Sequence, residues 1–117
     1  MRRLLPALAV VASLTACGGG GGGGDDDGIK VFKTMGSLQC TGGGVSLAAL
    51  QGQLTSANVQ VRFAECGTDG RPTPTVCGSP DGKIGIFEIS PAQSAAASAA
   101  GFAPLSTLPG AKTAPCS

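Results

Sequence analysis

The stretch Ile84-Gly85-Ile86-Phe87-Glu88-Ile89 carries apolar residues at alternate and at adjacent positions. Successive side chains of a strand point to opposite faces, so this stretch presents an apolar surface on both sides. A strand of that kind needs a covering layer on each face. It therefore predicts the central strand of a small sheet, around which the remaining elements can be placed.

Two further strands are expected on its N-terminal side. Residues 29–33 (Ile-Lys-Val-Phe-Lys) and residues 59–63 (Val-Gln-Val-Arg-Phe) alternate apolar and polar side chains. This alternation is typical of strands that are buried on one face only. The loop between residues 63 and 84 carries two Asp-Gly pairs and several prolines, which favour turns.

A helix is predicted after the first strand. Leucines recur at positions 47, 50 and 54, which is helical spacing, and Ser46 precedes them as an N-cap. Asn58 is suited to end this helix in a left-handed turn.

A second helix is predicted after Ile89. Ser90 is its expected N-cap, Pro91 its first residue and Gln93 the partner that closes a capping box. Gly101 is expected in the left-handed position beyond its end, with Phe102 making the hydrophobic contact that accompanies such an end.

The order of these elements, β-α-β-β-α, predicts an α+β domain. We expect a three-stranded mixed sheet with both helices on one face, because a strand-helix-strand crossover joins parallel strands. If Val31 and Ile86 face the helices, Phe32 and Phe87 lie on the opposite face. That face is either bare, which favours a protein partner or a homodimer, or covered by the Pro-rich tail 103–115.

The N-terminus has the form of a secretory signal. Arg2 and Arg3 provide positive charge, residues 4–14 are mostly apolar, and Thr15 and Ala16 are small. The apolar part is too short for the roughly 20 residues that a membrane-spanning helix needs. Residues 1–16 are therefore interpreted as a signal peptide that is removed.

The sequence Leu14-Thr15-Ala16-Cys17 resembles the lipobox of bacterial lipoproteins. This resemblance implies that Cys17 becomes the first residue of the mature chain and carries a diacylglyceryl group and usually a further acyl chain such as palmitate. Gly18 stands where an inner-membrane retention signal has Asp, which implies outer-membrane sorting. The expected location is the cell envelope, with the lipid bilayer as a partner and the domain in the periplasm or at the surface.

Residues 17–28 are predicted to form a tether. Seven glycines and three aspartates follow Cys17. A chain of this composition buries nothing and should be flexible, with a root-mean-square span of roughly 18 Å. The folded domain is expected to be residues 29–117.

Four cysteines follow the tether, at positions 40, 66, 77 and 116. An even number in an exported chain predicts disulfides, and four cysteines allow three connectivities. We favour Cys66 with Cys77, closing the loop between two strands, and Cys40 with Cys116, holding the tail.

The segments around these cysteines, such as Cys40-Thr41-Gly42-Gly43-Gly44 and Cys66-Gly67-Thr68-Asp69-Gly70, resemble those of small secreted proteobacterial lipoproteins of unknown role. This resemblance implies no activity.

The composition argues against several classes of function. The chain has no Trp, no Tyr and a net charge of only +1, which disfavours nucleic-acid binding. It has no His, which excludes Ser-His-Asp and Cys-His catalysis and the commonest zinc ligand. No catalytic residue, metal site or cofactor is therefore expected.

The sequence thus favours a membrane-anchored, non-catalytic binding module or envelope-structural protein, with an envelope protein or a second copy as its partner. The alternative is a small-ligand or inhibitor module that uses the loop Cys66–Pro80, because a long constrained loop is a usual place for recognition.

Overall fold

The computed structural model describes residues 28–116. The predicted signal peptide 1–16, the predicted lipidation site Cys17 and the predicted tether up to residue 27 lie outside the described residues.

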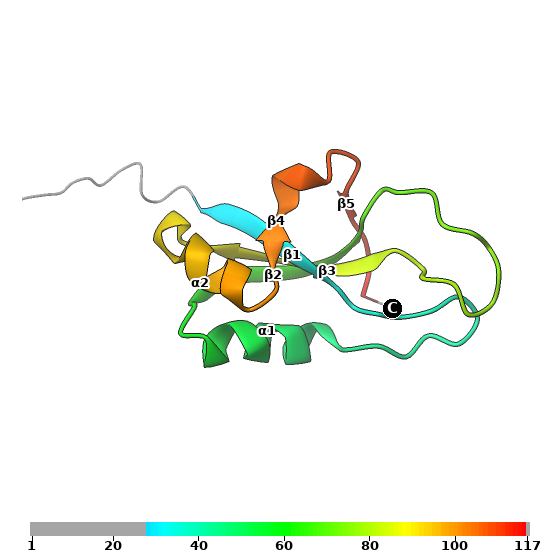
Figure 1. Ribbon diagram of the computed structural model, residues 1–117, viewed down its shortest axis with the longest axis horizontal. Coiled ribbons are helices and arrows are strands. Elements are labelled where there is room, and N and C mark those ends of the chain that lie inside the picture. Colours follow the sequence, from blue (N-terminus) through cyan, green and yellow to red (C-terminus); the bar gives the residue numbers. More distant parts are fainter. Residues whose placement is uncertain (1–27, 117) are drawn as a thin grey trace, which may run out of the picture.

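These residues form one sheet of five strands in the order β4-β1-β3-β2-β5, with every neighbouring pair antiparallel (Figure 1). The strands are β1 (Ile29–Thr34), β2 (Val61–Thr68), β3 (Lys83–Ile89), β4 (Ala103–Pro104) and β5 (Lys112–Thr113). The helices are α1 (Leu47–Ser56), α2 (Ser94–Ala99) and the short 3-10 helices η3 (Pro91–Gln93) and η4 (Leu105–Thr107).

The expected three-stranded mixed sheet is wrong in two respects. The tail adds β4 and β5 at the two edges, and these two-residue strands have no alternating pattern by which the sequence could reveal them. β1 and β2 do run parallel, but β3 lies between them, so no parallel pair forms. The doubly apolar β3 is central, as expected.

Both helices pack on one face of the sheet. Leu50 and Leu54 of α1 and Ala97 of α2 join a cluster with Val31 of β1 and Phe87 of β3, and all five are buried. The ring of Phe87 meets that of Phe102 edge-on, with 5.7 Å between the centroids. This cluster is the main core.

The opposite face is covered by the tail. Ile84 and Ile86 are each 1% exposed and pack with Leu108, while Leu105 and Phe32 flank them. Phe32 therefore lies on the face where it was expected, whereas Phe87 and Ile86 have exchanged places relative to the expectation. The exchange follows from register, because Phe87 pairs with the buried Val31, and directly opposed residues share a face.

The predicted helix ends are mostly confirmed. The Ser46 side chain accepts a hydrogen bond from the Ala49 N–H, and Asn58 has a φ of 64°. Ser90 caps η3 in the same manner. The capping box is wrong, because Gln93 turns away to hold the residues after α1: its oxygen accepts from the Gln60 N–H and its amide donates to the Asn58 carbonyl.

The strand expected at 59–63 begins later and is longer than expected. Val61 pairs with Ile89 but Phe63 pairs with Glu88, so the register shifts between them. Such a bulge ends the alternation of side chains. Phe63 is 53% exposed as a result, although its position in the pattern predicted a buried residue.

Candidate functional site

Two long loops meet at the end of the sheet opposite Ile29. β1 and β2 both run toward this end and β3 leaves from it, since Thr34 pairs with Ile84 and Thr68 with Lys83. Loop 35–46 follows β1, and loop 69–82 connects β2 to β3. Both loops therefore lie at this end of the sheet, at the right of Figure 1. We call these two loops the distal platform.

The two halves of the distal platform are joined by a continuation of the β1–β3 pairing. The Met35 N–H donates to the Lys83 carbonyl at 3.1 Å, and the Gln39 N–H donates to the Ser79 carbonyl at 2.7 Å. The Gln39 backbone carbonyl in turn accepts from the Gly78 N–H at 3.1 Å. This irregular ladder was not apparent from the sequence, because loop residues give no pairing signal.

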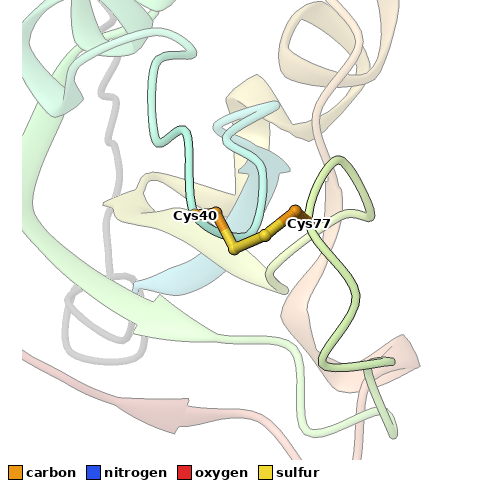
Figure 2. The surroundings of a disulfide bond; sticks show 2 residues. All are labelled: Cys40 and Cys77. Atoms are coloured by element: carbon orange, nitrogen blue, oxygen red, sulfur yellow. A yellow bond between two sulfur atoms is a disulfide. The ribbon is translucent and has the colours of Figure 1, made fainter.

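The ladder ends in a disulfide between Cys40 and Cys77, whose Cα atoms are 5.1 Å apart (Figure 2). Both cysteines are exposed. The favoured pairing of Cys66 with Cys77 is therefore wrong.

The second disulfide joins Cys66 to Cys116, so the favoured pairing of Cys40 with Cys116 is also wrong. Cys66 lies within β2 opposite Gly85 and is 4% exposed in the main core, whereas Cys77 is exposed in the loop 69–82. The tail reaches Cys66 beside β5, where the Ala114 N–H donates to the Cys66 carbonyl at 2.9 Å. The four cysteines do form two disulfides.

Asp81 fixes the base of the distal platform. One carboxylate oxygen accepts from the Ser37 hydroxyl at 2.8 Å and from the Lys83 N–H at 3.0 Å. Partial burial acts to raise the pKa of Asp81, but these hydrogen bonds and the Lys83 charge outweigh it, so the pKa lies below its ordinary value. Asp81 is therefore a structural carboxylate, held in its ionised form.

Asp69 and Gly70 fix the start of the second loop. The Asp69 carboxylate accepts from the Arg71 N–H at 2.9 Å, which forms a turn of the kind expected at an Asp-Gly pair. Gly70 lies directly against the backbone of Gly110, so a side chain there would collide with the tail. The loop consequently starts from a fixed base on the tail.

Several side chains of this loop are exposed to solvent. Val76 is 61% exposed, and Arg71 and Thr75 are exposed as well. Along this loop they offer an apolar contact, a charge and a hydroxyl to solvent. Such a mixture is suited to recognition of another molecule and contains no acid–base pair.

The glycine run 42–44 precedes α1 and lines a hollow of about 440 Å³ together with Lys83 and Cys116. All three glycines have a φ between 71° and 80°, and a side chain at Gly44 would overlap the Met35 carbonyl. The backbone path alone explains these glycines, which form the turn between β1 and α1.

Another hollow, of about 450 Å³, lies at the other end of the sheet, between β1 and η4. Ile29, Leu105 and Leu108 form its apolar walls, and Lys30 lies at its side. Nearby on the same sheet face, Lys30 donates to Glu65 at 3.1 Å.

Within residues 28–116, no group of three or more His, Cys, Asp or Glu is arranged to hold a metal ion. In the same range no helix is long and apolar enough to cross a membrane.

Comparison with known proteins finds no matching family model, no matching curated protein and no matching solved structure.

Proposed function

We propose that this chain is a bacterial lipoprotein, anchored by acylated Cys17, and that its domain is a non-catalytic module that binds an envelope component through the distal platform. The observation that supports this proposal most directly is the position of the two ends of the sheet. The predicted tether joins at Ile29, and the platform begins after Thr34 at the other end of β1. A six-residue strand spans about 20 Å, so an anchored domain would present its platform away from the lipid.

The construction of the platform agrees with a binding role. Its two loops are joined by a disulfide and backbone hydrogen bonds, which reduce the ordering that binding would otherwise require. Its carboxylates, Asp69 and Asp81, are engaged in turns. The platform includes most of the loop Cys66–Pro80, the candidate recognition loop. The sheet face opposite the helices, the other candidate surface, is covered by the tail.

The anchor is tested by the substitution Cys17→Ser. Intact-mass analysis of membrane-extracted protein is expected to show the wild type beginning at Cys17, with its acyl chains, and lacking four thiol hydrogens. The Cys17→Ser chain should leave the membrane fraction. A wild-type product that still begins at Met1 without acyl groups would contradict the proposal.

The binding surface is tested by photo-crosslinking from position 76 in cells. The control is position 95, which is exposed on α2 and lies outside the platform. One discrete adduct is expected from position 76 and none from position 95. The captured protein is then purified, and its affinity for variants of this chain is measured.

Val76→Asp and Arg71→Ser are expected to lower that affinity about tenfold or more, whereas the control Ala95→Asp should leave it unchanged. Val76→Asp and Ala95→Asp each place a new negative charge on an exposed site, one inside the platform and one outside it. If these two variants bind equally well, the platform is not the binding surface.

A further inference from the structure

We propose that Cys40–Cys77 is a thiol–disulfide exchange site, at which an incoming thiolate opens this bond while Cys66–Cys116 stays closed. The inference depends on the surroundings of the two disulfides and not on what the distal platform binds. Cys40 and Cys77 are both exposed, at the tips of two loops. Cys66, in contrast, is 4% exposed within the main core.

Exchange requires access to a sulfur along the S–S axis. A thiolate attacks one sulfur and forms a new S–S bond to it, the original S–S bond breaks, and the other sulfur departs with the bonding electron pair. Figure 2 shows that Cys40 and Cys77 come from separate loops at the end of the sheet. The departing sulfur of this pair enters water, where it is solvated and takes up a proton.

The same reaction is unfavourable at Cys66–Cys116. The core covers Cys66, which blocks attack on its sulfur. Cys116 is exposed, as Cys40 and Cys77 are, but attack on it would release a Cys66 thiolate into an apolar cluster that contains Leu50 and Phe87. An unpaired charge in such surroundings is costly, so Cys66 is a poor leaving group there.

The backbone at Cys40 adds a second difference. Its φ is 69°, a left-handed conformation that residues other than glycine rarely adopt. The reciprocal hydrogen bonds between Leu38 and Gly42 and the bond to Cys77 hold this turn. Opening the disulfide removes one of these restraints and lets Cys40 move toward a commoner conformation.

Opening Cys40–Cys77 should leave the fold intact. The ladder bonds between Gln39 and Ser79 and the side-chain bond between Ser37 and Asp81 do not depend on it. The second disulfide still holds the tail against β2. Exchange at this site is therefore a local event, which loosens the distal platform without unfolding the domain.

The test uses the full chain purified with both disulfides formed. Reduced glutathione is added under native conditions, thiols are trapped by alkylation at intervals, and the peptides that contain each cysteine are quantified by mass spectrometry. Cys40 and Cys77 are expected to react about tenfold faster, or more, than Cys66 and Cys116, with glutathione attached to Cys40 or Cys77 as an intermediate. The circular dichroism spectrum should not change during this first phase.

Equal rates for the two pairs, earlier opening of Cys66–Cys116, or opening that coincides with loss of the dichroism signal would each overturn the proposal. The variant with Cys40→Ala and Cys77→Ala keeps the core disulfide. It is expected to fold and to react only at the slow rate.

A second arm replaces glutathione by a protein dithiol of the thioredoxin class. Fast reaction with glutathione assigns the site to small thiols, and fast reaction with the dithiol alone assigns it to protein thiols. Absence of fast reaction with both reagents contradicts the proposal.

Discussion

Gly85 shows how a single missing side chain sets the distance between α1 and the sheet. A methyl group there would lie 2.9 Å from Leu50 and 3.1 Å from Leu47 and from the ring of Phe87. These contacts are tighter than packed carbon atoms tolerate, so α1 or the side chains must shift. A side chain at position 85 would therefore require the side chains of Leu50, Leu47 and Phe87 to shift.

Gly85→Ala is expected to lower the free energy of unfolding by about 1 to 3 kcal/mol through overpacking. Gly52→Ala is the matched control, because Gly52 lies in α1 with nothing near the position of the added methyl group. That substitution should raise stability by about 0.5 to 1 kcal/mol. Urea unfolding of both variants decides this point, and a destabilised Gly52→Ala together with an unchanged Gly85→Ala would contradict it.

Asp81 gives the molecule a defined response to acid. Because its pKa in the folded protein lies below the ordinary value of about 3.9, the folded state binds the proton less readily than the unfolded chain. The contribution of the Asp81 carboxylate to the free energy of unfolding is complete above about pH 4 to 5. It is lost as the pH falls through the pKa of Asp81 in the folded protein.

Asp81→Asn should remove this part of the pH dependence and cost about 1 kcal/mol at pH 7, where the charged acceptor is lost. Unfolding curves of both proteins from pH 7 to pH 2 should therefore converge in acid. Curves that remain parallel would show that the Asp81 carboxylate contributes nothing to acid sensitivity.

Residue-level signals in the sequence were reliable where the chemistry is local. The cap at Ser46, the left-handed turns at Asn58 and Gly101 and the cap at Ser90 require only neighbouring backbone groups. The predicted capping box at Gln93 failed because its side chain bonds to Asn58, 35 residues away in sequence. A partner so distant leaves no signal in the local sequence.

At the scale of elements, the tail 103–116 is the part that the sequence pattern hid. It contributes β4, η4 and β5, and its Leu108 lies over Ile84 and Ile86. Because β3 is apolar on both faces, some element had to cover the second face. The apolar pattern of β3 thus predicted that both of its faces need a cover. The tail was one of the two alternatives for the face opposite the helices.

Leu108→Ala is expected to lower the free energy of unfolding by about 2 to 5 kcal/mol, because it opens a cavity over the central strand. Leu105→Ala, at a partly buried neighbour, should cost less. Thermal unfolding of the two variants gives the comparison. An equal or larger loss at Leu105 would mean that η4, rather than Leu108, is the main cover.

The pairing of the cysteines also belongs to the scale of elements. Cys66 follows a bulge that sets its direction toward the main core, and Cys77 lies on a loop that an unforeseen ladder ties to residues 37–39. Neither effect is visible in the spacing of the cysteines. The pairing therefore required the register of the strands, which the sequence did not supply.

For the whole molecule, the two ends of the sheet have different characters. Residue 29 enters at one end, and two loops joined by a disulfide occupy the other. The Asp-Gly pairs and prolines of residues 63–84 predicted a long loop, so this half of the platform could be anticipated. The surface that the platform presents could not be anticipated, because Val76 and Arg71 lie in a segment without periodicity.

The central place of β3 has a consequence for biogenesis. β1 and β2 touch only through a strand that lies after both of them in the chain, so neither can find its sheet neighbour until residue 89 has emerged. Contacts between distant parts of a chain form late and slow the closure of the native structure. For a chain exported as proposed above, this delay would keep the sheet unformed until residue 89 has crossed the membrane.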